Sequence, residues 1–426
     1  MSFEYNEDLL QFIWEHQLYD SKNLKTADGE SIAVLKQGYL NSNSGPDFEN
    51  AEIKIGNTKH YGSIEIHINS KEWKQHKHHI DTAYNNVILH VCFSLSSEEK
   101  REDGTSIPSL EIGPRINTDA LAKYDNLMST KPFIPCQNQI ESVSSFDMEN
   151  WKDRMVIERL EDRCSLYKSF LQESNGNWNQ AFYIAIVRAF GMPINTLVFE
   201  DIAKQLPYDL VQKHHQSLFQ LEALFFGIAG LLYEDLKDNY YIGLQNEFSF
   251  LKTKYGLTTT SVKLKFGRMR PMNLPHVKLA QLAAFFHHVP QFINTVLDLP
   301  DSKKVKQLLK FNLSDFWNTH YSFAKPSGNR SKGISSAFVD HLFLNSIVPF
   351  VFYYEKEKTD VSQERALDYL ASIASEKNSI ISKWKATGVN SKNASSSQAL
   401  LHLYKTYCKP QRCLQCNIGK KLLLKV

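Results

Sequence analysis

The chain has 426 residues, with 49 lysines and arginines against 46 aspartates and glutamates, and a formal net charge of +3. Its hydrophobic content of 42% and charged content of 22% are ordinary for a globular protein, and its length allows two or three domains. So small a net charge neither requires nor excludes a polyanionic partner, because a local basic groove is lost in the sum.

Secretory and membrane classes are not favoured. The first eight residues are acidic and lack the basic-then-apolar pattern of a signal peptide. The longest apolar runs, Ala223–Leu232 and Ile347–Tyr354, are too short to cross a bilayer. Six cysteines in so long a chain do not suggest a disulfide framework. We therefore expect a soluble cytoplasmic protein with no membrane partner.

The first hundred residues predict an alternation of helices and strands. Apolar residues recur at helical spacing in the first segment, and β-prone runs bounded by turn residues follow. The expected elements are a helix over 7–19, strands over 31–36, 48–55 and 61–68, a helix over 70–84, a strand over 86–93 and an edge strand over 107–112. This α-β-β-β-α-β order predicts an α/β domain with a mixed sheet.

From Asp147 onward the pattern changes to helix after helix, without a repeat of fixed period. Helices are expected over 148–172, 178–190, 195–205, 209–235, 276–286, 335–354, 361–374 and 395–407. The predicted organisation is an α/β domain over 1–113, a linker over 114–146, an α-helical domain over 147–400 and a cysteine-bearing tail over 401–426.

Two carboxylates and a histidine fall on neighbouring predicted strands. Asp47 precedes one strand, and Glu65 and His67 share a face of the next because they are two residues apart. A three-residue hairpin loop, Gly56 to Thr58, would place Asp47 opposite His67, whereas a two- or four-residue loop would turn it away unless a bulge intervened. Phosphodiester cleavage needs a divalent metal on hard oxygen ligands and a group that orients water. The alternative is a plain turn followed by an exposed glutamate.

The element order and these three positions resemble the core of the PD-(D/E)XK nucleases, whose Asp begins the second strand and whose Glu-x-Lys lies on the third. The resemblance implies a restriction-endonuclease-like sheet in which Asp47 and Glu65 bind Mg²⁺ or Mn²⁺. His67 stands in place of the lysine, where it would orient water or complete the metal shell and shift preference toward manganese or zinc. Because histidine is mostly neutral at pH 7, catalysis could also be lost while nucleic-acid binding remains.

Histidines are concentrated just after the Glu-x-His strand. On the predicted helix, His76 shares a face with Trp73 and points at the sheet, so His76 and Tyr84 would support the metal or contact the substrate phosphate. A competing interpretation is a zinc hydrolase of another substrate that uses His67, His76 and His90. A polar helix with several histidines is also commonly only solvated, and a histidine on an apolar strand is commonly a satisfied core residue.

Three cysteines lie within nine residues near the C-terminus, as Cys408, Cys413 and Cys416. Thiolates so closely spaced typically bind zinc or an iron–sulfur cluster, and Cys136 in the linker is the candidate for a fourth ligand. Some RecB-like members of the nuclease superfamily fasten their chain with a cluster whose ligands come from distant parts of the sequence, which this array resembles. The alternative is reduced cysteines without a metal.

A basic loop over residues 263–271 precedes a proline-rich connection into the next helix. Arg268 and Arg270 would bind substrate phosphates there, because arginine pairs bidentately with them. Short basic loops are also commonly only solvated.

Six short motifs, from Gly-Pro-Asp-Phe at 45–48 to Cys-Leu-x-Cys-x-Ile-Gly at 413–419, together resemble an uncharacterised bacterial family, domain of unknown function 2851, over essentially the whole chain. That family implies no activity. The sequence thus predicts a metal-dependent nuclease-like protein that acts on nucleic acid. The alternatives are a non-catalytic nucleic-acid-binding or assembly protein on a degenerate nuclease fold, and the histidine-based zinc hydrolase.

Overall fold

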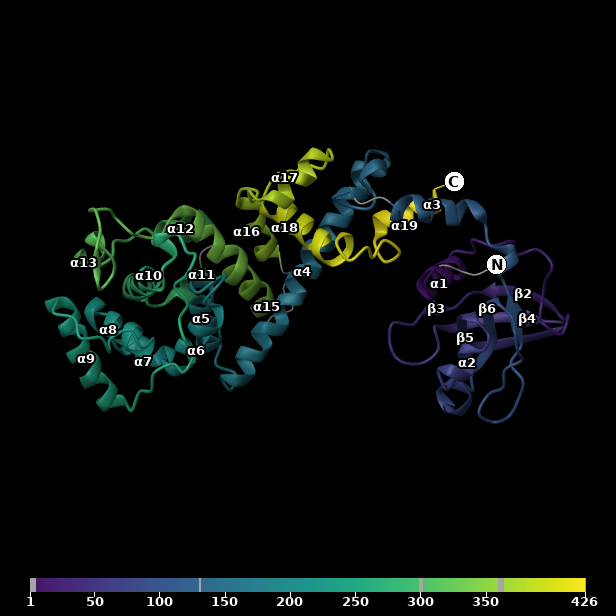
Figure 1. The fold of residues 1–426 in the computed structure, drawn as a ribbon, viewed down its shortest axis with the longest axis horizontal. Coiled ribbons are helices and arrows are strands. Elements are labelled where there is room, and N and C mark those ends of the chain that lie inside the picture. Colours follow the sequence, from purple (N-terminus) through teal and green to yellow (C-terminus); the bar gives the residue numbers. More distant parts are fainter. Residues whose placement is uncertain (1–4, 130–131, 299–301, 359–363, 426) are drawn as a thin grey trace. The chain divides into compact units, whose positions relative to one another are not determined.

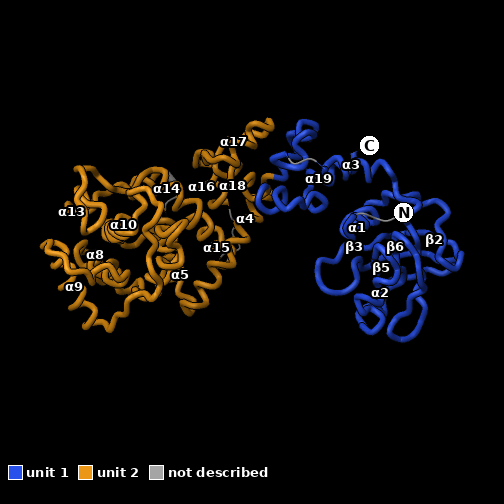
Figure 2. Tube along the Cα trace, in the orientation of Figure 1, with its two compact units in different colours: residues 1–151, 404–426 blue, residues 152–403 orange. Residues whose placement is uncertain are grey.

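The structure is a computed structural model that describes residues 5–129, 132–298, 302–358 and 364–425. It divides into two compact units, of which unit 1 comprises residues 1–151 and 404–426 and unit 2 residues 152–403 (Figure 2). Unit 1 is therefore discontinuous in sequence, because residues 404–426 fold with the first part of the chain.

Unit 1 contains a mixed sheet (Figure 1). Its strand order is β1-β2-β4-β5-β6-β7, and β3 pairs with β4. Strand β4 is antiparallel to β2, β3 and β5, whereas β6 is parallel to β5 and β7. The strands are β1 (Leu24–Lys25), β2 (Ser31–Lys36), β3 (Tyr39–Leu40), β4 (Phe48–Ile55), β5 (Thr58–Asn69), β6 (Val87–Ser94) and β7 (Ser109–Glu111). The predicted N-terminal sheet and mainly helical remainder are thus confirmed.

The centre of the sheet is β5, whose residues 62–67 are buried on both faces. Helix α1 (Glu7–Glu15) packs against this strand through its apolar face. At the start of the β5–β6 pairing, a Cβ on Gly62 would lie 2.4 Å from the carbonyl oxygen of Asn86, so only glycine allows the two backbones to approach. Glu65 and His67 consequently sit in the most enclosed part of the sheet.

The hairpin between β4 and β5 differs from the predicted one. Ile55 pairs with Thr58, so the loop has two residues, Gly56 and Asn57, and the predicted three-residue loop is wrong. Gly56 has a φ of +55°, which a two-residue hairpin turn requires and glycine adopts without strain.

The predicted continuous helix over 70–84 is also wrong. Lys77 has a φ of +66°, which no helix accommodates, and the side chain of Asp81 accepts from the backbone N–H of Ala83 to begin a new turn. Ile80 is consequently 64% exposed and does not face the sheet. The segment is divided into α2 (Glu72–Gln75) and the 3₁₀ turns η1 (His78–Ile80) and η2 (Thr82–Tyr84).

Beyond the sheet, unit 1 is completed by helical segments from both ends of the chain. The predicted linker over 114–146 contains three of them and the cysteine-bearing tail contains a π turn and a helix. These are η3 (Gly113–Arg115), α3 (Thr118–Met128), η4 (Gln137–Ser142), η7 (Tyr404–Cys408) and α19 (Asn417–Leu424). The division between the units falls within α4 (Ser145–Glu173).

Unit 2 is helical apart from the short strands β8 (His320–Ser322) and β9 (Lys325–Pro326). Its helices are α5 (Trp178–Phe190), α6 (Thr196–Gln205), α7 (Tyr208–Lys213), α8 (Leu218–Ile228), α9 (Asn239–Tyr255), η5 (Pro271–Asn273), α10 (Pro275–His288), α11 (Phe292–Asp298), α12 (Ser302–Leu308), α13 (Asp315–Thr319), α14 (Ser336–Leu342), η6 (Phe343–Ile347), α15 (Val348–Lys358), α16 (Glu364–Ser372), α17 (Ser379–Ala386) and α18 (Ala394–Leu403). The predicted helix over 209–235 is two helices. Helices α9, α11, α12, α13 and α17 were not predicted, and residues 361–363 of a predicted helix lie outside the described residues.

Within the described residues, the continuous helical stretch Ser336–Lys358 is long and apolar enough, by length and composition, to cross a membrane. The share of its most apolar window that is buried inside the protein is 67%. Core helices of soluble proteins pass the same test, and polar residues such as Asp340 and Asn345 interrupt the apolar run in the sequence.

A buried carboxyl group connects three helices of unit 2. Glu222 on α8 is 1% exposed, and its Oε1 accepts from Ser314 Oγ at 2.9 Å and from Trp317 Nε1 at 3.0 Å. Its Oε2 accepts from the hydroxyl of Tyr240 on α9. Burial raises the pKa of Glu222 from its usual 4.5 to about 7, although these hydrogen bonds oppose the shift.

We expect Glu222 to make unit 2 less stable as the pH rises from about 4.5 to about 7, because in that window the folded chain holds a proton that the unfolded chain has released. The free energy of unfolding should fall by up to ~3 kcal/mol across the window. Denaturant titrations at several pH values would test this. Glu222→Gln should flatten the dependence and Asp235→Asn, at an exposed site, should not. An unchanged pH dependence in Glu222→Gln would refute the assignment.

Candidate metal centre

A bulge in β4 brings Asp47 to the same face as Glu65. Phe48 pairs with Ile64, but Ala51 pairs with Gly62, so β4 carries one more residue than β5 between these pairs. The two-residue hairpin alone would place Asp47 on the face of the sheet opposite to Glu65. The extra residue in β4 returns Asp47 to the face of Glu65. Asp47 lies level with Glu65 rather than with His67 as predicted, and these two positions of β5 share a face.

Asp47 is fixed by three hydrogen bonds. Its Oδ2 accepts from the backbone N–H of Ile66 at 2.9 Å, and its Oδ1 accepts from Gln11 Nε2 of α1 at 2.9 Å. Its own backbone N–H donates to Glu65 Oε2 at 3.1 Å. Each carboxylate oxygen of Asp47 keeps a second lone pair that can bind a cation or a water molecule.

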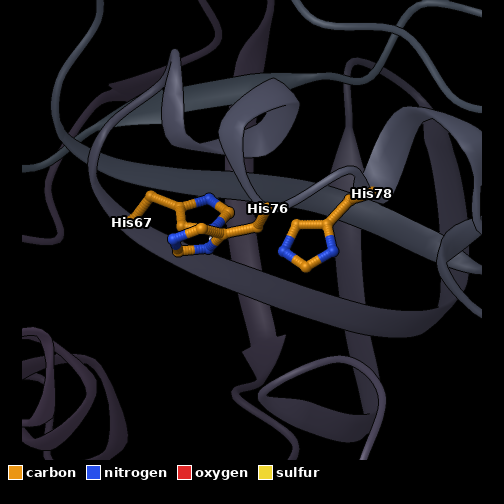
Figure 3. Close-up of side chains that lie close together, drawn as sticks. All are labelled: His67, His76 and His78. Carbon is orange, nitrogen blue, oxygen red and sulfur yellow. Dashed lines mark hydrogen bonds between the residues drawn. The ribbon is translucent and has the colours of Figure 1, made fainter.

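Three imidazole rings converge beside Glu65, and Figure 3 shows them turned toward one another. One ligand atom from each of His67, His76 and His78 lies within 4.8 Å of the other two. Glu65 Oε1 is 3.2 Å from His78 Nε2 and 3.6 Å from His67 Nε2. His76 is exposed, whereas His67 and His78 are buried, so the group opens to solvent on the His76 side.

His90 stands behind this group. Its Nε2 lies 2.8 Å from His67 Nδ1, and it is completely buried on β6. When His67 Nδ1 donates this hydrogen bond, His67 Nε2 presents a lone pair toward His76 and Glu65, which is the tautomer that a metal ligand needs. His90 therefore orients His67. The predicted set of His67, His76 and His90 is corrected, because His78 takes the place of His90 in the converging group.

The charges of the centre are shifted toward neutrality. Burial, followed by repulsion from Glu65, raises the pKa of Asp47 to about 7, and burial raises that of Glu65 to about 8. Burial and the neighbouring histidines lower the pKa of His67 to about 2. His67 is thus a neutral imidazole at physiological pH, and it cannot supply the positive charge of the lysine that the nuclease resemblance would place there.

These residues fit a divalent transition metal. His78 Nε2 is buried and makes no hydrogen bond of regular geometry within the described parts of the chain, and Glu65 Oε1 lies beside it at 3.2 Å. Three imidazole nitrogens with a carboxylate oxygen suit Zn²⁺ or Mn²⁺ better than Mg²⁺, which prefers oxygen ligands alone. The cation would also favour the charged form of the buried carboxylates.

Two members of the site could not be read from the sequence. His78 turns inward because Lys77 reverses the backbone, and the predicted continuous helix contained no such reversal. Glu7, in the first turn of α1, has its pKa raised to about 8 by burial and then by Asp47, Glu72 and Glu65, so it belongs to the same acidic surroundings. The only sequence signal for Glu7 is an acidic residue at the start of the helix before the sheet.

Tyr84 lies against the site. Its ring stacks on that of His78 with centroids 3.8 Å apart, and burial, Glu65 and Asp47 raise its pKa to about 12. It thus helps to hold His78 in place.

The two predicted phosphate-binding arginines lie in unit 2. Arg268 and Arg270 line one hollow, and Arg270 also lines a second of about 650 Å³, together with Arg330. None of the residues that line these two hollows is acidic. Lys278 lines both, and burial lowers its pKa to about 7. The predicted cysteine ligands, in contrast, all belong to unit 1.

A family model described as "Protein of unknown function (DUF2851)" matches residues 7–379. The match includes the carboxylates and histidines of the candidate centre and ends before the C-terminal cysteines. No curated protein and no solved structure matches the chain.

We expect the chelator-treated protein to bind one Mn²⁺ per chain at this centre. His76→Ala or His78→Ala should weaken binding by at least about tenfold, because each removes a nitrogen ligand. His79→Ala is the matched control, since His79 is adjacent in sequence but outside the converging group. Titration followed by electron paramagnetic resonance would measure this, and Mn²⁺ is chosen because thiolates bind it poorly. Equal affinity in all three variants would exclude the site.

Proposed function

The chain belongs to the DUF2851 family, and we propose that it is a metal-dependent hydrolase that cleaves phosphodiester bonds in nucleic acid. The observation that carries the proposal is the pairing of Asp47 and Glu65 on adjoining strands beside three converging histidines. Buried carboxylates and imidazoles are costly to collect in one place, and a catalytic metal is the ordinary reason for doing so.

The topology supports a restriction-endonuclease-like assignment. An antiparallel series, β2-β4-β5, is followed by a crossover to the parallel strand β6, and α1 packs on β5. The two carboxylates stand at the start of β4 and in the middle of β5, as in the Asp and Glu-x-Lys pattern of those nucleases.

In this proposal the metal ligands and Asp47 have different roles. A divalent cation held by Glu65 and the three histidines would polarise the phosphate and lower the pKa of an attacking water. Asp47 would orient that water and take its proton as the new P–O bond forms and the P–O bond to the leaving group breaks. His76, the exposed member of the group, marks the side from which a substrate enters.

The replacement of lysine by His67 sets the electrostatics of this proposal. A neutral His67 adds no positive charge near the phosphate. The bound cation and basic residues outside the centre must therefore balance the negative charge of the phosphate. Unit 2 contains basic residues in two hollows, which are lined by Arg268, Arg270 and Arg330. We propose that these residues bind backbone phosphates of a nucleic acid.

A second candidate function follows from the histidine group itself. Three imidazoles and a glutamate also suit a zinc hydrolase of a substrate other than nucleic acid. Such an enzyme would depend on His76 and His78 but not on Arg270.

Nuclease assays on single- and double-stranded DNA and RNA with Mn²⁺, Zn²⁺ or Mg²⁺ test the proposal. Asp47→Asn and Glu65→Gln should each lower cleavage at least about 100-fold, since one loses the proton acceptor and the other a metal ligand. His60→Gln, on the same strand but outside the centre, should retain activity.

Full cleavage in both carboxylate variants would refute the proposal. So would the absence of cleavage with every metal and substrate, and in that case retained nucleic-acid binding would indicate a non-catalytic protein on a nuclease-like fold. Hydrolysis of small esters that depends on His76 would favour the second candidate.

Binding to nucleic acid should depend on the unit 2 hollows. We expect Arg270→Ala combined with Arg330→Ala to weaken binding of a short oligonucleotide about tenfold. The slope of the logarithm of the binding constant against the logarithm of the salt concentration should become less steep by about one for each phosphate that the variant no longer binds. Lys237→Ala, an exposed lysine that lines neither hollow, is the control. Fluorescence anisotropy at several salt concentrations would measure both quantities. A change no larger than that of the control would rule out these hollows.

A further inference from the structure

Four cysteines from distant parts of the sequence meet in unit 1. Cys136, Cys408, Cys413 and Cys416 are all free thiols and all less than a tenth exposed. Each of Cys136 and Cys408 has its pKa raised by burial and then by other members of the group, which places the four sulfurs within electrostatic range of one another.

The chain on either side of these cysteines is packed to hold them together. The rings of Phe133 and Tyr404 stack with centroids 4.7 Å apart, and those of Trp151 and Tyr407 lie 5.7 Å apart. A Cβ on Gly419 would lie 2.2 Å from the carbonyl oxygen of Cys413, so the tail turns more tightly there than any other residue would permit.

Cys416 lies at the start of α19, where it is the N-cap residue. Burial raises the pKa of its thiol, and the backbone N–H groups of Gly419 and Ile418 and the indole N–H of Trp151 oppose that rise. Such donors would stabilise a metal-bound thiolate at this position.

The spacing of the sulfurs distinguishes between the metals that four cysteines usually bind. Tetrahedral zinc would bring four sulfurs within ~3.8 Å of one another. Across the described residues, the group whose ligand atoms all lie within 4.8 Å is the histidine group, and no three of the cysteines qualify. A four-iron cluster, in which each cysteine binds a different iron, holds its sulfurs farther apart.

We propose that Cys136, Cys408, Cys413 and Cys416 bind a [4Fe–4S] cluster that fastens residues 404–426 to the N-terminal part of unit 1. Lysine and arginine residues follow the tail cysteines closely, and they offset the net negative charge of a cluster with four thiolates. The inference does not rest on the hydrolytic activity proposed above, because the cysteines are separate from the histidine group.

The full chain, produced and purified without oxygen, should contain about four iron and about four acid-labile sulfide per molecule. It should show a broad visible absorption that bleaches on reduction with dithionite. Cys136→Ser and Cys413→Ser should each lose most of the iron and this absorption. Cys164→Ser, a cysteine of unit 2 outside the group, should keep both.

Three outcomes would overturn the proposal: one zinc per chain without iron, no metal in the anaerobic protein after reconstitution with iron and sulfide, or a full cluster in Cys136→Ser. If a variant fails to fold, the iron and sulfide content of the wild-type protein still decides. A further readout is proteolysis, since removal of the cluster from the wild type should expose residues 404–426 to cleavage while residues 152–403 stay intact.

Discussion

The burial of charge on one face of β5 is the constraint on which unit 1 depends. Glu65 and His67 lie in the middle of a strand that is covered on both sides, and Asp47 is held level with Glu65. Ionised groups out of water must be paired, neutralised or bound to a metal. The raised pKa values of both carboxyl groups and the lowered pKa of His67 follow from this constraint, because burial disfavours the charged form of each group.

Much of the sheet could be predicted because its strands obey simple alternation and burial. Strands β2 and β4 begin and end at the predicted residues, and the predicted positions of Asp47 before β4 and of Glu65 within β5 are confirmed. The register could not be predicted, because it depends on two local conformations with opposite effects. The two-residue turn would move Asp47 to the other face of the sheet, and the bulge in β4 returns it to the face of Glu65. His78 was missed for a similar reason, since a single residue with positive φ, Lys77, overrides helical periodicity.

Part of the cysteine group could be predicted because its pattern is local in sequence and does not depend on strand register. Three of its members are close together in sequence, so their spacing alone indicates a metal site, whereas the choice of Cys136 depended on chemistry and not on periodicity. Several helices of unit 2 were located by apolar spacing, but α9, α11, α12, α13 and α17 were missed. In α9, the longest of these, apolar and polar residues are mixed around the axis. Tertiary packing decides such elements, and a sequence pattern carries little of that information.

The discontinuity of unit 1 has a consequence for the order in which the protein is made. Residues 404–426 leave the ribosome only after residues 152–403 of unit 2, which separate them from the first part of unit 1. The N-terminal segment therefore cannot be completed early in translation, however quickly its sheet forms. A chain cut short by a stop codon before residue 404 would keep every residue of the carboxylate and histidine centre and still lack part of the unit that contains it. Synthesis of the cysteine-bearing tail is therefore needed to complete the unit that contains this site.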